Sequence, residues 1–495
     1  MARSSAARDD IAPQNGAAPG GAASGAKKNE VVQVLRPDET IEEKLYEVSK
    51  KIYPRAVRGW FAAWRWALVW LTQLIFYGGA WLTWNGRQAV LFDIARRKFY
   101  IFGLVFWPQD IIYLSLLLIV SALALFLFTA VAGRLWCGYA CPQTVYTEIF
   151  MWIEQLIEGA RTQRIRLDRE KPGLRKIGLK AAKHAVWIAI GLWTGFTFVG
   201  YFTPIRELWG EALTVTMGPW ETFWVLFYGF ATYGNAGWMR EQVCKYMCPY
   251  ARFQSAMFDR DTLIITYDRE RGEPRGGRGR HAERGALGDC VDCSVCVQVC
   301  PTGIDIREGL QYECIGCAAC IDGCDQVMDK MGYARGLIRY STTHAMERKL
   351  NRVQMFARAL RPRVLIYSAI LAAVVVATAA SLWLRVPLKV DVIRDRAAIS
   401  REVEGGLIEN VYRLQIMNTT EIGRDYELRA EGLPGLQIAG EARVPVEPAA
   451  TRMVTVRLRV PAGQSAPGTH RVYFSVSATG DARIAVREKS VFIIR

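Results

Sequence analysis

The 495-residue chain contains little histidine, and its cysteine is confined to one part of the sequence. Of the four histidines, only His184 borders a long apolar run. A transmembrane b-type haem needs axial histidines within such runs, and no C-x2-C-H attachment motif occurs, so a cytochrome is not indicated. No glycine-rich dinucleotide fingerprint follows a recognisable strand. The first 35 residues lack the apolar core of a signal peptide, and we expect residues 1–40 to form a disordered cytoplasmic tail.

All twelve cysteines lie between residues 137 and 324, and eight of them form two runs with the C-x2-C-x2-C-x3-C spacing of two-cluster bacterial ferredoxins. In such ferredoxins the fourth cysteine of each run ligates the other cluster. The spacing therefore predicts two [4Fe-4S] clusters, one held by Cys290, Cys293, Cys296 and Cys324 and the other by Cys314, Cys317, Cys320 and Cys300. Zinc and disulfides are the alternatives, and zinc sites usually combine two C-x2-C pairs that are far apart.

Five uncharged apolar runs are each long enough to cross a bilayer. They cover about 66–84, 111–133, 185–205, 222–239 and 364–384. The expected fold class is therefore a multi-pass α-helical membrane protein with about five spans, carrying an inserted cytoplasmic domain. Residues 101–107 are apolar but too short to span, and we expect an interfacial segment there.

The distribution of Lys and Arg predicts the orientation of these spans. Basic residues are dense at 50–65 and at 161–183, whereas the connection between the third and fourth spans carries only Arg206. The N-terminus and residues 240–363 are accordingly expected in the cytoplasm, and everything after 385 outside. Four basic residues oppose this assignment, namely Arg87, Arg96, Arg97 and Lys98. The net charge of +16 is then a topology signal in membrane-flanking loops, and no nucleic-acid partner is expected.

The remaining four cysteines form a repeated C-x3-C-P motif, Cys137–Cys141–Pro142 and Cys244–Cys248–Pro249. Each copy follows an even-numbered span, so the repeat predicts that both dithiols meet at one membrane surface. If the turn is helical, the two cysteines of a motif share one face. Such a pair can hold a soft ion such as Cu(I) or exchange with a disulfide, and four thiols can hold a larger site. Buried structural cysteine is the alternative.

The spans and motifs divide the chain into a membrane domain (41–260), a ferredoxin-like domain (261–350), a fifth span (364–384) and a C-terminal unit (386–495). Short alternating segments in the last unit, separated by turn residues, predict an antiparallel β-sandwich. The expected strands are 411–417, 426–430, 436–439, 453–460, 471–476 and 484–494. This unit has no cysteine, and an interaction or stabilising role is expected for it.

The stretches Asn85–Asp93 and Gly237–Gln254 resemble the FixG/RdxA/CcoG family, accessory proteins of cbb3-type cytochrome c oxidase assembly in bacteria. The resemblance covers the chain from about residue 40 onward. It implies an immunoglobulin-like C-terminal domain, a place in the bacterial inner membrane and a cupric reductase that supplies Cu(I) to the oxidase. It also implies that the eight ferredoxin cysteines hold the clusters and that four others form the catalytic redox or copper site, Cys137, Cys141, Cys244 and Cys248.

The partners that the resemblance implies are oxidase assembly factors and copper-handling proteins. The electron donor stays open, and so does the oligomeric state, with a homodimer among the options. Two other functions also stay open. One is a quinol dehydrogenase that feeds a periplasmic reductase, and the other is a copper carrier or assembly scaffold without turnover. The four membrane-side cysteines could hold copper, a third cluster or nothing.

Overall fold

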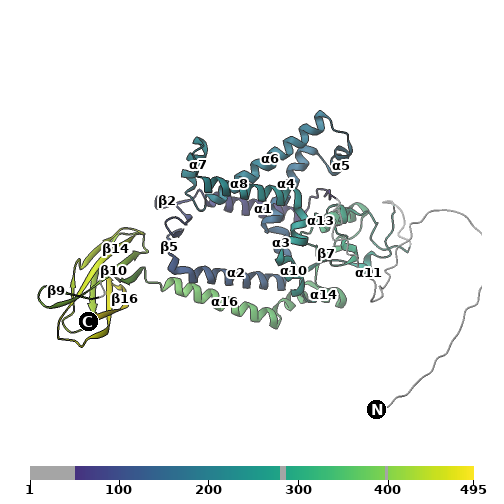
Figure 1. Ribbon diagram of the computed structural model, residues 1–495. Coiled ribbons are helices and arrows are strands. Elements are labelled where there is room, and N and C mark those ends of the chain that lie inside the picture. The colour runs from purple at the N-terminus through teal and green to yellow at the C-terminus, as the bar shows by residue number, and fades with distance from the viewer. Residues whose placement is uncertain (1–50, 279–285, 396–399, 495) are drawn as a thin grey trace, which may run out of the picture. The chain divides into compact units, whose positions relative to one another are not determined.

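The computed structural model describes residues 51–278, 286–395 and 400–494, without the side chain of Ser255. The expected tail 1–40 lies outside these residues. From Trp60 to Met257 the described chain is mostly helical (Figure 1). The helices are α1 (Trp60–Gly79), α2 (Ile111–Ala132), α3 (Leu135–Tyr139), α4 (Pro142–Glu158), α5 (Arg161–Arg169), α6 (Leu174–Val199), α7 (Ile205–Thr214), α8 (Pro219–Tyr233), the π-helix η2 (Gly234–Met239), α9 (Arg240–Gln242), the π-helix η3 (Val243–Met247) and α10 (Pro249–Met257).

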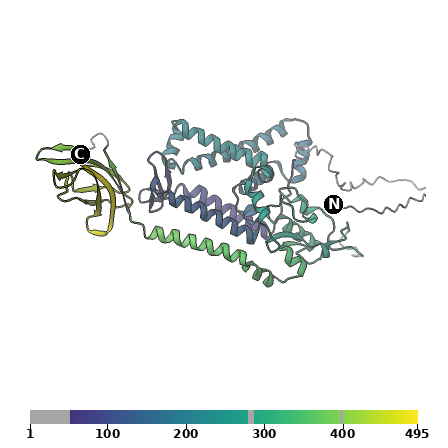
Figure 2. The ribbon, with the colours of Figure 1, turned by 60° about the horizontal axis from the view of Figure 1, so that its bottom comes forward.

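Two helical stretches among the described residues are long and apolar enough to cross a membrane. They are Pro108–Ala132, which includes α2, and α16 (Pro362–Trp383). Only 0% and 6% of their apolar windows are buried against the rest of the protein, which suits contact with lipid. The hydroxyl of Tyr113 near the start of α2 lies 3.0 Å from the hydroxyl of Ser381 near the end of α16. The two helices therefore pack antiparallel (Figures 1 and 2).

The two ends of this helix pair contact different parts of the chain. At one end Ala130, in the last turn of α2, accepts hydrogen bonds from Arg361 (2.6 Å) and from Thr262 (3.1 Å), which lead into α16 and the ferredoxin domain. At the other end Asp110 forms ion pairs with Arg385 (2.7 Å) and with Lys389. The cysteine-rich domain and the β domain thus attach to opposite ends of α2 and α16.

The other three expected spans coincide with α1, α6 and α8. These helices are not among the described ones that are long and apolar enough to cross a membrane. Helix α6 begins at Leu174, earlier than expected, and its first half carries several lysines and arginines. Helix α8 has only 15 residues before the chain continues as the π-helix η2. Helix α1 contains Arg65 and Gln73, both buried. The five-span topology stays a prediction for these three helices.

A small β-structure follows α1, which the sequence analysis did not anticipate. Its strands are β1 (Thr83–Trp84), β2 (Arg87–Gln88), β3 (Val90–Asp93), β4 (Lys98–Ile101) and β5 (Leu104–Phe106). The segment 101–107, expected at the membrane interface, contains β5, which pairs with β4; its place at the interface stays a prediction. Three of the basic residues that opposed the expected topology have partners. Arg87 pairs with Glu421, Arg96 with Asp93 (3.7 Å), and Lys98 donates to the carbonyl of Ala449 (2.7 Å).

The cysteine-rich domain is closed by two antiparallel strands, β6 (Ile264–Tyr267) and β7 (Ile338–Ser341). Between them lie short helices and the two cysteine runs. The helices are α11 (Arg269–Gly272), α12 (Val295–Gln298), the 3-10 helix η4 (Ile306–Glu308) and α13 (Ala319–Met331). After β7, α14 (Thr343–Arg348), α15 (Arg352–Ala357) and the 3-10 helix η5 (Arg358–Leu360) lead into α16. The core combines cysteines with apolar residues such as Ile265, Met328 and Leu337.

The C-terminal domain is an antiparallel sandwich, as expected. One sheet has the strand order β12–β14–β10–β8, with β9 also on β10, and the other has β13–β11–β15–β16. The strands are β8 (Leu388–Arg394), β9 (Arg401–Val403), β10 (Leu407–Asn418), β11 (Arg424–Glu431), β12 (Gln437–Ala439), β13 (Arg443–Val446), β14 (Thr451–Pro461), β15 (Gly468–Ala478) and β16 (Asp481–Ile494). The structure has a strand at each of the six expected segments and adds β8, β9 and β13. Tyr412 and Phe474, both fully buried, pack edge to face across the core at 5.1 Å between ring centroids.

The opposite attachment of the two domains predicts the outcome of reporter fusions. Alkaline phosphatase should be active when fused after Arg385 and inactive when fused after Gly276. Activity at Gly276 and not at Arg385 would show that the basic residues near β2 and β4 determine the orientation instead.

The core contact between Tyr412 and Phe474 predicts the effect of truncating it. Phe474→Ala in a 386–495 fragment should lower the free energy of unfolding by about 3–5 kcal/mol, because it removes a buried ring and leaves a cavity. Arg471→Ala, on an exposed position of the same strand, should stay within about 0.5 kcal/mol of the unaltered fragment. Urea unfolding followed by circular dichroism measures both. Equal effects of the two substitutions would contradict the assigned core.

Candidate iron–sulfur cavities and dithiol site

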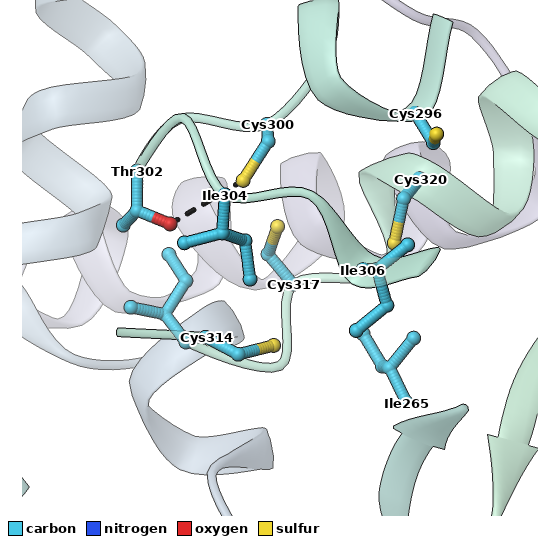
Figure 3. A pocket seen from close by; sticks show the side chains of 10 residues that line it. Ile265, Cys296, Cys300, Thr302, Ile304, Ile306, Cys314, Cys317 and Cys320 are labelled. Carbon is cyan, nitrogen blue, oxygen red and sulfur yellow. Dashed lines mark hydrogen bonds between the residues drawn. The ribbon is translucent and has the colours of Figure 1, made fainter. Parts of the chain in front are cut away.

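The cysteines of the two ferredoxin runs line two cavities of about 20 Å³ each. Around one cavity lie Cys290, Cys293, Cys296 and Cys324. Around the other lie Cys300, Cys314, Cys317 and Cys320, together with Cys296 (Figure 3). The fourth cysteine of each run thus lies with the first three of the other run. The structure brings together the two sets that the crossover spacing predicts, and their role as ligands stays a prediction.

The two runs fold in the same way because corresponding residues adopt the same unusual backbone conformation. Asp292 (φ 50°) and Gly316 (φ 69°) precede the second cysteine of each run, and Ser294 (φ 54°) and Ala318 (φ 59°) follow it. All four lie in the left-handed region, which costs free energy for residues with a side chain. This alternation turns the chain around each cavity. A helix then begins at Val295 in the first run and at Ala319 in the second.

The donors at both cavities fit a [4Fe-4S] cluster better than a single ion. Among the described residues, no three His, Cys, Asp or Glu side chains converge to hold one metal ion, as zinc would require. A cubane instead carries its thiolates on separate irons. Burial raises the pKa of Cys314 and Cys324 to about 12, so these thiols stay protonated until a metal displaces the proton.

The two C-x3-C-P motifs meet in the structure, as the repeat predicted. Cys137 interacts electrostatically with Cys141 and Cys244, and Cys244 interacts with both Cys141 and Cys248. The Cys137 thiol donates to the side-chain oxygen of Gln254 (3.3 Å), and the Thr144 hydroxyl donates to the carbonyl of Cys137 (2.5 Å). Burial raises the pKa of Cys137 to about 12 and that of Cys244 to about 11. Both thiols are therefore neutral near pH 7 without a metal.

The helical turn that would place both cysteines of a motif on one face is not present. Helix α3 ends at Tyr139, and Cys141 has an extended backbone with Pro142 at the first position of α4. Cys248 is likewise extended before Pro249, which begins α10. The physical reason is the proline, whose ring disfavours the helical conformation of the preceding residue. Cys244 lies in a π-helix, so the two copies of the motif also differ from one another.

A glutamine directly after the first motif holds the backbone that leads into the second. The side-chain nitrogen of Gln143 donates to the carbonyls of Asn235 (2.9 Å) and Arg240 (3.1 Å). Arg240 lies between the two π-helices with a positive φ of 28°. Its guanidinium pairs with Glu154 of α4 at 2.9 Å, and Glu154 is 1% exposed. The position of Cys244 thus depends on side chains of α4.

The turn that carries Cys137 and Cys141, the first dithiol turn, also lies directly against a cluster cavity. A Cβ atom on Gly138 would come within 2.8 Å of the Cα atom of Cys317, so only glycine allows this backbone approach. A third cavity, of about 30 Å³, lies between Cys317 and Cys244. Arg65 and Glu148 also line it. Sequence reasoning singled out none of Gly138, Gln143, Arg65 and Glu148, because no spacing rule signals contacts between such distant segments.

Comparison with known protein families agrees with this arrangement. The model of a 4Fe-4S dicluster domain matches residues 239–343, and that of a 4Fe-4S binding domain matches 114–159. The model of the immunoglobulin-like fold at the C-terminus of FixG matches 378–495. The expected 4Fe-4S-binding domain and the immunoglobulin-like C-terminal domain are thereby confirmed, whereas the second 4Fe-4S match, at 114–159, falls in the expected membrane domain.

Full-length relatives cover most of the chain. The nitrogen fixation protein FixG of Rhizobium meliloti (strain 1021) is 38% identical over 467 residues, 85% of this chain and 88% of that protein. Protein RdxA of Cereibacter sphaeroides is 41% identical over 443 residues, 87% of this chain and 93% of that protein. Protein RdxB of the same organism is 39% identical over 442 residues, 87% and 92% of the two chains. A crystal structure of a FixG-related protein from Vibrio parahaemolyticus matches 22% of this chain and 97% of that chain at 24% identity, with a TM-score of 0.21.

The two cavities predict how iron is lost from ligand variants. Anaerobically purified protein should hold about eight irons and eight labile sulfides in the two ferredoxin-type cavities, as two cubanes require. Cys300→Ser and Cys314→Ser should each lower the count by about four. Because both residues line the same cavity, the double variant should lose no more than either single variant.

The variant pair Cys300→Ser with Cys290→Ser is the matched control, since its members line different cavities and should together remove nearly all of this iron. The opposite pattern of losses would show that each run holds its own cluster without crossover. Iron and sulfide analysis and the EPR spectrum of the reduced protein measure these outcomes.

Proposed function

Because this chain belongs to the FixG/RdxA family of iron–sulfur electron-transfer proteins, we propose that it is a membrane-bound cupric reductase that supplies Cu(I) for assembly of cbb3-type cytochrome c oxidase. The observation that carries the proposal is the position of Cys317. This cysteine lies in backbone contact with the first dithiol turn and shares a cavity with Cys244 of the second. No other residue separates the predicted cluster ligand from Gly138.

The chemistry of the donors supports copper as the substrate. Thiolates favour Cu(I) over harder divalent ions, so a dithiol that holds the product stabilises it relative to Cu(II). The clusters, when bound to their eight cysteines, would supply the single electron that each Cu(II) needs. The raised pKa values of Cys137 and Cys244 imply that each thiol releases its proton when the ion binds.

A second candidate for the dithiols is a third [4Fe-4S] cluster. The 4Fe-4S binding model matches residues 114–159, yet this stretch contains only Cys137 and Cys141. The structure places Cys244 and Cys248 beside them, which completes a set of four thiols. On this alternative the full protein would hold about twelve irons rather than eight.

The dithiol assignment predicts the behaviour of Cys244→Ser combined with Cys248→Ser. Protein with reduced clusters, freed of reductant, is mixed anaerobically with Cu(II) and a Cu(I)-specific chelator. The double variant should form Cu(I) no faster than a protein-free control, because Cu(II) no longer binds at the four-thiol site beside Cys317, while its EPR signals before copper addition stay those of the unaltered protein. Cys137→Ser with Cys141→Ser should behave alike if the two motifs form one site.

Two controls make this result specific. Among the described residues the Thr232 hydroxyl donates to the carbonyl of Tyr228 in its own helix, so the Thr232→Ala variant should reduce Cu(II) normally. Protein with oxidised clusters shows how much Cu(I) arises from the thiols alone, since two thiols can reduce two Cu(II) by forming a disulfide. Unaltered Cu(II) reduction in both cysteine double variants would exclude the proposed site. Loss of about four irons in either one would favour the third cluster.

A further inference from the structure

A buried arginine lies at the junction between the second cluster cavity and the dithiols. Arg65 of α1 is 6% exposed and lines the small cavity together with Cys317 and Cys244. Its Nη2 atom lies 3.4 Å from Glu148 Oε1, and its Nε atom has no hydrogen-bond partner among the described residues. Arg65 therefore brings a positive charge, with donor capacity to spare, into a region that is largely closed to water.

Arg65 is held there by the ferredoxin domain itself. Asp322 lies between Cys320 and Cys324 in α13, and its carboxylate accepts hydrogen bonds from the backbone nitrogens of Phe61 (3.3 Å) and Ala62 (2.7 Å). This contact fixes the first turn of α1 against α13. Arg65 follows Ala62 by three residues, so both lie on the buried face of the helix. This packing directs the guanidinium toward the small cavity that Cys317 and Cys244 line.

The charge around Cys317 comes from two residues of opposite sign. Cys317 interacts electrostatically with Arg65 and, in the opposite sense, with Glu148. Arg134 lies near the same loop, but its guanidinium is engaged by the backbone carbonyls of Tyr312, Cys314 and Ala251. The charge of Arg134 acts on Cys314 of the same cavity, whereas Arg65 and Glu148 are the oppositely charged pair that acts on Cys317 itself.

The other cluster cavity has a different electrostatic environment. Arg307 lies near Cys296, but it is paired with Asp305 at 2.6 Å and with Asp292 at 2.5 Å, so carboxylates offset its charge. Asp325 adds a carboxylate beside Cys324. The two cavities thus have similar thiol donors and unlike surrounding charges.

Reduction of an iron–sulfur cluster adds one negative charge, so a buried cation beside it stabilises the reduced form. We propose that Arg65 raises the reduction potential of the cluster that Cys300, Cys314, Cys317 and Cys320 would hold, and that Glu148 limits this rise. Arg65 then favours residence of the electron at the cavity that adjoins the dithiols. It contacts neither dithiol motif through a hydrogen bond, and it acts on the potential alone.

The test is an EPR-monitored redox titration of the anaerobically purified full chain and three variants. Arg65→Gln should lower one midpoint potential, by about 59 mV or more, which corresponds to a tenfold change in the equilibrium constant of a one-electron couple. Arg65→Lys keeps the charge and should shift the same midpoint less. Glu148→Gln removes the opposing charge and should shift it upward. Arg260→Gln, an exposed ion-pair residue, should change neither midpoint.

The midpoint that moves should belong to the signal lost in Cys300→Ser, and the other midpoint should stay in place. A purely structural role for Arg65 would not produce shifts of opposite sign in the Gln variants at 65 and 148. If Arg65→Gln loses iron, the direction of the Glu148→Gln shift decides the matter. No shift, or a downward shift, in Glu148→Gln would overturn the proposal, and this result does not depend on whether copper is the substrate.

Discussion

The functional arrangement depends on one close contact between two backbones, that of Gly138 with Cys317. The gap is so short that a single added carbon would overlap the cluster loop. No side chain separates the dithiol turn from the loop at this contact. The contact also explains why the cysteine-rich domain lies at the end of the helices where α2 leads into α3, since the loop and the turn fit only together.

A buried ionic network holds the second dithiol in its place beside this contact. Glu154 accepts from Arg164 at 3.2 Å and from Arg240 at 2.9 Å, and Lys183 lies 3.6 Å away. Removing one member of such a buried network typically costs about 3–5 kcal/mol, because a charge is left without a partner. That anchoring keeps Arg240 at a positive φ between two π-helices, a conformation that persists only where the surroundings determine it. The irregular backbone that carries Cys244 is thus a consequence of the packing of α4.

Sequence reasoning succeeded where chemistry follows from spacing and failed where it follows from contact. The cysteine spacing led to the two sets of four that line the cavities, and alternation located most strands of the sandwich. The short strands β1 to β5 escaped notice because two to four residues show no reliable periodicity. The extended conformation of Cys141 was available from Pro142 and was overlooked. The roles of Gly138, Gln143 and Arg65 were not accessible, since each depends on a partner far away in the chain.

The duplicated motif has diverged in a way that assigns different environments to its two copies. Cys137 lies in a regular helical turn, and its thiol is occupied by a hydrogen bond to Gln254. Cys244 lies in a π-helix and lines the cavity that also reaches Cys317, Arg65 and Glu148. Different residues precede the two copies: Gly133, with a positive φ, before the first and the Glu154-anchored Arg240 before the second. A repeat brings two dithiols to one place: the first copy touches the cluster loop through Gly138, and the second shares the third cavity with Cys317.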